Sequence, residues 1–279
     1  MANKILNTLL QEAVKAAVNK TAAPTPAKKT TATTALTPAE IRKSFDKPAA
    51  APTVTLPKNV QTIKFGSFDW IVLERKGDMA LVITERLVEQ RNWNETAADV
   101  RWETCTLRAY LNGEFYNSFA PGDQKRIVEV TNQNPNTRGP DYEIPGGNPT
   151  NDKVFLLSLD EVLRYFGDST AAFKEWRTTY DAVYLRKIPN PKGFSLVYDF
   201  SDANDKQRVA IRPLSAAPAA DKKSGDVPYA WWTRSRGKSK GDYCAACVHF
   251  NGKIYDKGFT VRGVVGGRAC VRPALWLKN

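Results

Sequence analysis

The sequence predicts an α+β fold with antiparallel sheets, two to four helices and long loops. Three observations lead to this class. Short apolar runs separated by glycine turns occur at both ends of residues 56–279, as expected of antiparallel strands. Apolar side chains at helical spacing are confined to the middle of this region. Residues 132–152 are dense in Asn, Pro and Gly and predict a long loop.

Residues 1–55 are predicted to lie outside this fold. Residues 1–20 place apolar side chains on one face of an amphipathic helix, whereas residues 21–55 are rich in Ala, Thr, Pro and Lys. Such a composition buries too little apolar surface to fold, and it predicts a disordered, flexible linker. An isolated helix of about 15 residues is marginally stable. Two alternatives therefore stay open: the helix docks onto a larger assembly, or it is a frayed tail.

The first strands are predicted over residues 63–73, as two strands or as one bent at Gly66, and over residues 80–84 after a turn at Gly77. Helices are predicted next, and then a buried strand. Ser158 and Glu161 have the spacing of a capping box, which predicts that a helix begins there. The helices are expected over residues 102–119, 122–130, 159–166 and 171–179, and the buried strand over residues 154–157.

The C-terminal part predicts a further set of short strands. Gly252 and Gly258 each follow a polar residue and supply the positive φ angles that tight turns need. Strands are expected over residues 230–233, 245–249 and 271–277, with weaker ones near Ile254 and Val261. Trp231 and Trp232 are adjacent and would point to opposite faces of a strand, most simply as packing residues.

Charge and apolar content narrow the functional classes. The net charge of +12 is divided into +6 for residues 1–58, −3 for residues 59–221 and +9 for residues 222–279. The basic C-terminal region is compatible with nucleic acid or an acidic glycan, but a solvated basic surface is the favoured interpretation. No apolar run approaches the roughly 20 residues that span a bilayer. Asn7, Gln11 and Glu12 interrupt the first apolar stretch, so we expect no signal peptide and a cytoplasmic or virion-associated protein.

Neither a metal site nor a cofactor is predicted. Four cysteines are too few for a disulfide framework in a chain of 279 residues. Cys244 and Cys247 have metal-ligand spacing, but a zinc site needs two more ligands and His249 is the single histidine. One histidine also disfavours Ser-His or Cys-His catalysis. Neither Gly-Gly pair is followed by the Lys-Ser/Thr of a phosphate-binding loop.

The chain resembles a bacterial family of uncharacterised domains through motifs that span about 220 residues in order. The motifs are Phe65-Gly66-Ser67-Phe68-Asp69-Trp70, Trp102-Glu103-Thr104-Cys105-Thr106-Leu107, Pro145-Gly146-Gly147-Asn148, Lys153-Val154-Phe155-Leu156-Leu157-Ser158, Trp231-Trp232-Thr233-Arg234-Ser235 and Val271-Arg272-Pro273-Ala274-Leu275-Trp276-Leu277. The C-terminal half looks like the C-type lectin fold, and is similar to the formylglycine-generating-enzyme branch and to variable proteins of diversity-generating retroelements. Cys270 and Arg236 depart from the usual Gly and Pro.

This resemblance implies a rigid scaffold that presents a variable binding surface to a protein or glycan, as on a receptor-binding protein of a phage. Tyr and Arg supply large contact areas at modest entropic cost, so they favour binding. Retroelement diversification of Asn codons could encode all of the residues that we expect at this surface. They are Tyr243, His249, Phe250, Tyr255, Asp256, Phe259, Arg262 and Arg268.

Two other functional classes stay open. A metal-dependent enzyme of the formylglycine-generating branch would use copper-binding cysteines, for which Cys244, Cys247 and Cys270 are the possible analogues. Nucleic-acid binding would use the basic C-terminal region. Whatever the function, we expect Arg272 to form a buried ion pair, with Asp69 or Glu103 as its partner.

Overall fold

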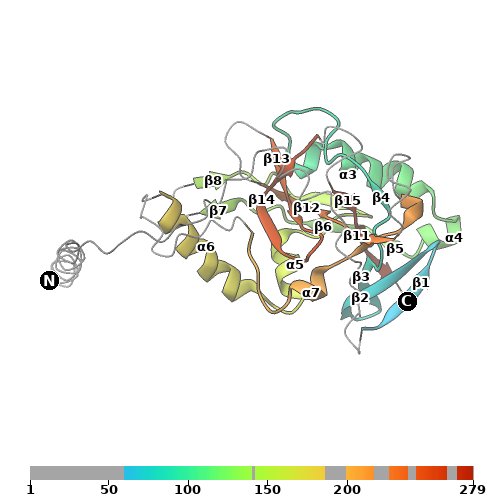
Figure 1. Ribbon diagram of the computed structural model, residues 1–279. Coiled ribbons are helices and arrows are strands. Elements are labelled where there is room, and N and C mark those ends of the chain that lie inside the picture. Colours follow the sequence, from blue (N-terminus) through green and yellow to red (C-terminus); the bar gives the residue numbers. More distant parts are fainter. Residues whose placement is uncertain are drawn as a thin grey trace, which may run out of the picture. The chain divides into compact units, whose positions relative to one another are not determined.

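Two five-stranded sheets carry most of the fold. The computed structural model describes residues 60–139, 142–185, 199–216, 226–237, 243–262 and 269–278 (Figure 1). The class is α+β with mostly antiparallel sheets and few helices, as predicted. In this part of the chain, no helix combines the length and apolar character needed to cross a membrane. The expected helix over residues 1–20 and linker over residues 21–55 lie outside the described residues and stay predictions.

The first sheet is antiparallel throughout and has the order β1-β2-β3-β16-β5. Its strands are β1 (Thr62–Phe65), β2 (Phe68–Lys76), β3 (Met79–Thr84), β5 (Ile127–Val128) and β16 (Ala274–Lys278). Gly66, with φ of +58°, makes the tight turn between β1 and β2. A Cβ at that position would lie 2.8 Å from the Phe119 ring, so both the conformation and the space favour glycine.

The second sheet has the order β14-β13-β12-β15-β4, and only the β12–β15 pair is parallel. Its strands are β4 (Glu89–Gln90), β12 (Trp231–Arg236), β13 (Cys244–Val248), β14 (Ile254–Thr260) and β15 (Cys270–Val271). One long strand, β14, takes the place of the two weak strands predicted near Ile254 and Val261.

The C-terminal segment belongs to both sheets. The sequence predicts one strand over residues 271–277, but β15 pairs with β12 and β4, and β16 pairs with β3 and β5. The chain changes sheet at Arg272 and Pro273. Proline lacks the N–H that a continuous ladder needs, and its carbonyl accepts a hydrogen bond from the amide of Thr84 at 3.0 Å.

The helices are short and lie in the middle of the chain. They are the 3₁₀-helix η1 (Trp102–Thr104), α3 (Thr106–Tyr110), the π-helical turn η2 (Leu111–Phe115), α4 (Pro121–Gln124), α5 (Leu159–Tyr165), α6 (Thr170–Leu185), α7 (Asp205–Arg208) and the 3₁₀-helix η3 (Leu214–Ala216). The capping box is confirmed, because Ser158 Oγ accepts from the Glu161 amide and the Glu161 carboxylate accepts from the Ser158 amide. The helix predicted over residues 122–130 is wrong beyond Gln124, where the chain turns into β5.

Residues 132–152 are not a structureless loop. They contain strands that form two-stranded sheets, β6 (Val130–Asn132) with β9 (Thr150–Asp152) and β7 (Thr137–Gly139) with β8 (Tyr142–Ile144). A third small sheet pairs β10 (Ile211–Arg212) with β11 (Val227–Pro228). Residues 154–157 are buried as predicted, but their pairing is limited to a bridge between Phe155 and Ala274.

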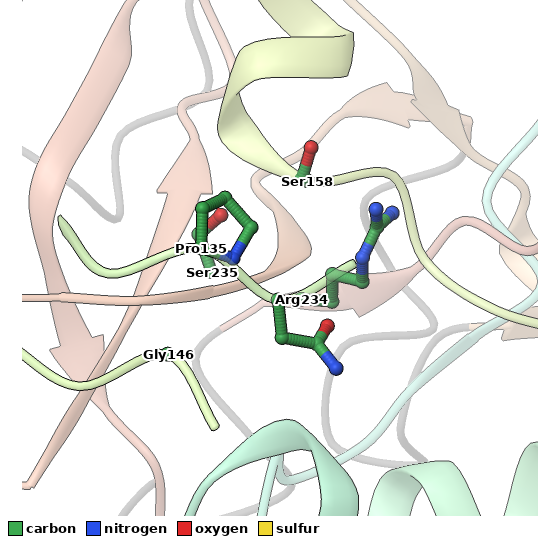
Figure 2. Close-up of a pocket in the computed structure, with 6 residues that line it drawn as sticks. Pro135, Gly146, Ser158, Arg234 and Ser235 are labelled. Carbon is green, nitrogen blue, oxygen red and sulfur yellow. The ribbon is translucent and has the colours of Figure 1, made fainter. Parts of the chain in front are cut away.

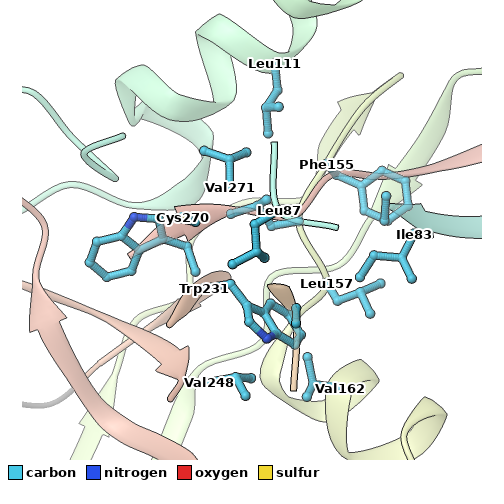
Figure 3. Packing of buried hydrophobic residues seen from close by; sticks show 14 of the residues in the cluster. Ile83, Leu87, Leu111, Phe155, Leu157, Val162, Trp231, Val248, Cys270 and Val271 are labelled. Carbon is cyan, nitrogen blue, oxygen red and sulfur yellow. The ribbon is translucent and has the colours of Figure 1, made fainter. Parts of the chain in front are cut away.

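Apolar side chains from both sheets and from α5 pack into one core (Figure 3). Five tryptophans are completely buried, and each indole N–H finds an acceptor, which removes the cost of burying an unpaired donor. The acceptors are the carbonyls of Phe65 for Trp70, Thr233 for Trp93, Arg208 for Trp231 and Arg91 for Trp232, and the Asp152 carboxylate for Trp102.

Arg272 is buried in this core without a carboxylate partner. Asp69 and Glu103, the partners predicted from the sequence, instead pair with Lys64 and Arg101. Among the described residues, no carboxylate lies within ion-pair distance of Arg272. Its guanidinium donates to the carbonyls of Thr84 (3.0 Å) and Glu85 (3.5 Å) and lies 5.0 Å from the centre of the Trp231 ring. Burial lowers the pKa of Arg272 to about 9, so it stays charged at neutral pH.

The carboxylate of Asp152 holds the middle of the chain to β9. Its side chain is fully buried and accepts five hydrogen bonds from separate segments. The donors are Trp102 Nε1, Arg108 Nε, Asn112 Nδ2, Asn132 Nδ2 and Thr150 Oγ1. One carboxylate therefore positions η1, α3 and η2 against the small β6–β9 sheet.

We expect Asp152→Ala to lower the free energy of unfolding by about 3–5 kcal/mol, because it leaves Arg108 and the other donors without their acceptor. Urea denaturation followed by tryptophan fluorescence measures the change. Glu129→Ala is the control: that side chain is exposed, and removing it should cost less than about 0.5 kcal/mol. Equal losses in the two variants would contradict the role given to Asp152.

Candidate functional site

Strands β12, β13 and β14 lie side by side and bring four aromatic side chains together on one face of the second sheet (Figure 1). Trp232 pairs with Cys247, which in turn pairs with Tyr255, so the register puts these three on the same face. His249 lies two residues beyond Cys247 and therefore points the same way. Phe259 pairs with Ala245 and extends the row along β14. We call Trp232, His249, Tyr255 and Phe259 the aromatic face.

The rings of the aromatic face contact one another. His249 stacks on Phe259 with ring centres 5.3 Å apart and an angle of 16° between the rings. Tyr255 lies 5.0 Å from His249 and 5.5 Å from Phe259, and Trp232 meets Phe259 edge-on at 6.2 Å. These are favourable aromatic geometries, and each ring restricts the motion of its neighbours.

The four rings differ in their access to solvent. Trp232 and His249 are buried, whereas Tyr255 and Phe259 on the edge strand β14 are half-buried. A ligand would therefore meet the two rings of β14, and the other two would support them. Burial, and then the charges of Cys247 and Asp199, raise the pKa of Tyr255 to about 12. At neutral pH its hydroxyl keeps its proton and can donate a hydrogen bond.

Asp199 orients His249 from outside the sheet. The carboxylate Oδ2 lies 2.9 Å from His249 Nδ1, and the Asp199 side chain is 22% exposed. A carboxylate in this position fixes the orientation of the imidazole ring. Asp199 is not among the site residues predicted from the sequence, because fifty residues separate it from His249 and no local motif marks it.

A bulge in β14 shapes the aromatic face, because the four residue steps from Tyr255 to Phe259 face only two steps from Cys247 to Ala245. The β13–β14 register shifts between Ala245 and Cys247, opposite Gly258. The sequence predicts a turn at Gly258, but this glycine lies inside β14 with φ of +73°, and an added Cβ would stand 1.8 Å from the Ala245 carbonyl oxygen. The positive φ and the close approach accommodate the bulge. The turn predicted at Gly252 is confirmed, with φ of +83°.

The other residues predicted at the binding surface lie apart from the aromatic face. Tyr243 (41% exposed) and Arg262 are at one end of the β13–β14 pair, where the Val261 amide donates to the Tyr243 carbonyl. Phe250, 40% exposed, lies in the turn at the other end. Arg268 lies outside the described residues.

Two predicted surface residues are buried, and the expectation that they face solvent is wrong. Asp256 follows Tyr255 on β14 and so points to the opposite face, where Arg177 of α6 lies 3.3 Å away. His249 is on the expected face but is covered by its neighbours and by Asp199. The prediction for Asp256 was wrong because successive residues of a strand point to opposite faces. The prediction for His249 was wrong because Asp199, which is distant in sequence, covers it.

The four cysteines are free thiols buried in the fold. Burial raises the pKa of Cys105 to about 12 and the pKa of Cys247 well above its ordinary value. A metal ligand or nucleophile must be a thiolate, which such burial disfavours. Among the described residues, no group of three or more His, Cys, Asp and Glu side chains gathers where it could hold a metal ion.

A second feature lies at the other end of β12. A small polar hollow is formed between the start of α5, the end of β12 and residues 134–146 (Figure 2). It is lined by Asn134, Pro135, Gly146, Ser158, Arg234 and Ser235. It is far smaller than a pocket for an organic ligand, because it has room for about one water molecule.

Residues 77–279 match a protein family described as a domain of unknown function, DUF6273. The chain belongs to the DUF6273 family. The matched region of this DUF6273 protein contains the whole second sheet, the aromatic face and the polar hollow. Strands β1 and β2 precede it, although they complete the first sheet. No curated protein and no solved structure matches the chain.

We expect the thiols of the native protein to resist alkylation by iodoacetamide at pH 8, because burial keeps them protonated and out of reach. Mass spectrometry after labelling should find the native chain unmodified. The same treatment in guanidinium chloride is the control and should add four labels, one for each cysteine. Rapid labelling of Cys244 or Cys247 in the native protein would instead identify an accessible, reactive thiol.

Proposed function

We propose that this DUF6273 protein is a non-catalytic recognition protein and that its ligand, a protein or a glycan, binds at the aromatic face. One observation carries the proposal. Tyr255 and Phe259 are half-buried on an edge strand, while the buried rings of Trp232 and His249 hold them from behind. A pair of large rings that is fixed and still reaches solvent is typical of a binding hot spot.

The arrangement limits the entropic cost of binding. Association loses affinity whenever side chains must be ordered at the interface. Here the ring contacts and the Asp199–His249 contact order Phe259 and Tyr255 before any ligand arrives. The Tyr255 hydroxyl adds a directional donor, and aromatic surfaces with such polar atoms suit both protein and carbohydrate ligands.

We propose also that the α+β body is C-type-lectin-like. The two motifs that carry this resemblance have connected positions in the fold. Residues 231–235 lie in β12, which is central in the second sheet, and residues 271–277 form the segment that joins the two sheets. The resemblance therefore involves the framework that supports the aromatic face.

A surface diversified by a retroelement, or displayed by a phage, is the more specific form of this proposal. Burial limits which positions such a surface could vary. Of the residues that Asn-codon diversification can encode, Cys244, Cys247, Asp256 and Cys270 are buried, and changing them would damage the core. Of the described residues that are expected at the binding surface, five reach solvent: Tyr243, Phe250, Tyr255, Phe259 and Arg262.

Binding can be tested on an array of bacterial surface polysaccharides and surface proteins probed with the full chain. For any component that binds, we expect Tyr255→Ser and Phe259→Ser each to weaken the affinity by about 30-fold, as for hot-spot residues worth about 2 kcal/mol. Tyr116→Ser is the matched control: this half-buried ring follows η2, outside the surface expected to bind, and its loss should leave the affinity unchanged. Retained binding in both β14 variants would reject the proposal.

Comparison of gene copies tests the diversified form separately. We expect a neighbouring reverse transcriptase gene and an imperfect template repeat, with variation at the codons of Tyr243, Phe250, Tyr255, Phe259 and Arg262. The buried Cys247 and Cys270 should stay constant, because the core has no room for other side chains. A locus with neither gene feature would remove the retroelement proposal and leave the recognition proposal standing.

A further inference from the structure

The polar hollow beside β12 contains two buried polar atoms that lack a protein partner. Arg234 is 4% exposed, and its two Nη atoms are fully engaged. Nη1 and Nη2 donate to both oxygens of the Glu161 carboxylate and to the carbonyls of Leu156 (2.9 Å) and Gln133 (3.3 Å). The Nε–H of Arg234 has no acceptor among the described residues.

Asn134 faces the same hollow with the complementary group. Its Nδ2 donates to the carbonyl of Asn148 at 2.7 Å, which fixes the orientation of the side-chain amide, because an oxygen there would face another oxygen. Its Oδ1 is buried and has no donor among the described residues. The unsatisfied donor and the unsatisfied acceptor therefore belong to two residues that line a single hollow. Each would cost about 1–3 kcal/mol if it stayed unpaired.

Two serine hydroxyls complete the lining. Ser235 Oγ accepts from the Leu159 amide at 2.9 Å, and Ser158 Oγ accepts from the Glu161 amide at 3.2 Å. A hydroxyl that accepts one hydrogen bond still has its own proton to donate and a second lone pair. Figure 2 shows Ser158 at the start of the helix α5, with Arg234 and Ser235 on the neighbouring strand.

We infer that this hollow is a specific site for one ordered water molecule. The water accepts from Arg234 Nε–H and donates to Asn134 Oδ1, and its remaining hydrogen and lone pair are available to the serine hydroxyls. A buried water molecule requires two to four polar partners and a space of about its own size, and this hollow offers both. The space enclosed by the lining is about 180 Å³ in total and includes a part open to solvent.

The lining excludes other small ligands. An anion would be repelled by the Asn134 amide oxygen, and the charge of Arg234 is already compensated by Glu161. A cation would lie against the guanidinium of Arg234. An apolar group would leave both polar atoms unpaired. Water is the ligand that donates and accepts in the same place.

The water would join three segments of the fold. Asn134 and Gly146 belong to the chain between β6 and β9, Arg234 and Ser235 to β12, and Ser158 to the cap of α5. Within the first of these segments Gly146 allows a close approach to residues 134 and 135, because an added Cβ would lie 2.2 Å from the carbonyl oxygens of Asn134 and Pro135. The water thus holds the segment of residues 133–149 against the strand that carries Trp232.

A crystal structure of the full chain soaked in sodium bromide tests the site. We expect a density peak within hydrogen-bond distance of Arg234 Nε and Asn134 Oδ1, about 2.7–3.2 Å from each, without anomalous signal from bromide. A bromide signal would identify an anion site and overturn the inference. The absence of any peak bonded to both atoms would overturn it as well.

Nuclear magnetic resonance provides a second test, in solution. The Nε–H of Arg234, assigned by its disappearance in Arg234→Lys, should give a cross-peak with a long-lived water. Arg272 is the matched control, because its buried Nε–H donates to the Thr84 carbonyl at 3.0 Å and should give no such cross-peak. If Arg234 Nε–H shows no contact with water, the inference fails. Neither test depends on ligand binding at the aromatic face.

Discussion

The passage of the chain from one sheet to the other at Arg272 and Pro273 is the constraint on which the fold depends. β15 lies between β12 and β4 in the second sheet, and three residues later β16 enters the first sheet between β3 and β5. Arg272 bridges the two, because it donates to carbonyls at the end of β3 and lies over the Trp231 ring of β12. Burying a charge that no carboxylate neutralises costs free energy of folding. The contacts of the Arg272 guanidinium with the carbonyls and with the Trp231 ring must therefore both be present to offset this cost.

That constraint sets the position of the aromatic face. Trp231 packs into the core next to Arg272, so its neighbour Trp232 must point to the opposite side of β12. The bulge of β14 at Gly258 then aligns β13 and β14 beside it, so that Tyr255 and Phe259 extend the row of rings. The most exposed part of the proposed site is thereby fixed by the most buried part of the fold.

Local signals predicted the fold well, and contacts distant in sequence were not predictable. The Ser158 capping box, the interruption at Gly66 between two strands and the α+β class each depend on neighbouring residues, and all are confirmed. The predicted partners of Arg272 were wrong, since sequence spacing carries no information on which buried carbonyls will converge on one guanidinium. In the same way, only the completed fold brings the Asp199 carboxylate to His249. The same holds for the Asp152 carboxylate and the indole N–H of Trp102.

Strand alternation divides β14 into residues that a ligand can reach and residues that the fold needs. Tyr255, Lys257 and Phe259 are half-buried, whereas Ile254, Asp256 and Gly258 are buried between them. Asp256 contacts Arg177 of α6, and Gly258 allows no side chain at all. The proposed recognition on this sheet would therefore use alternate residues of one edge strand. A surface of this kind can change its ligand through a few side chains without disturbing the two sheets beneath it.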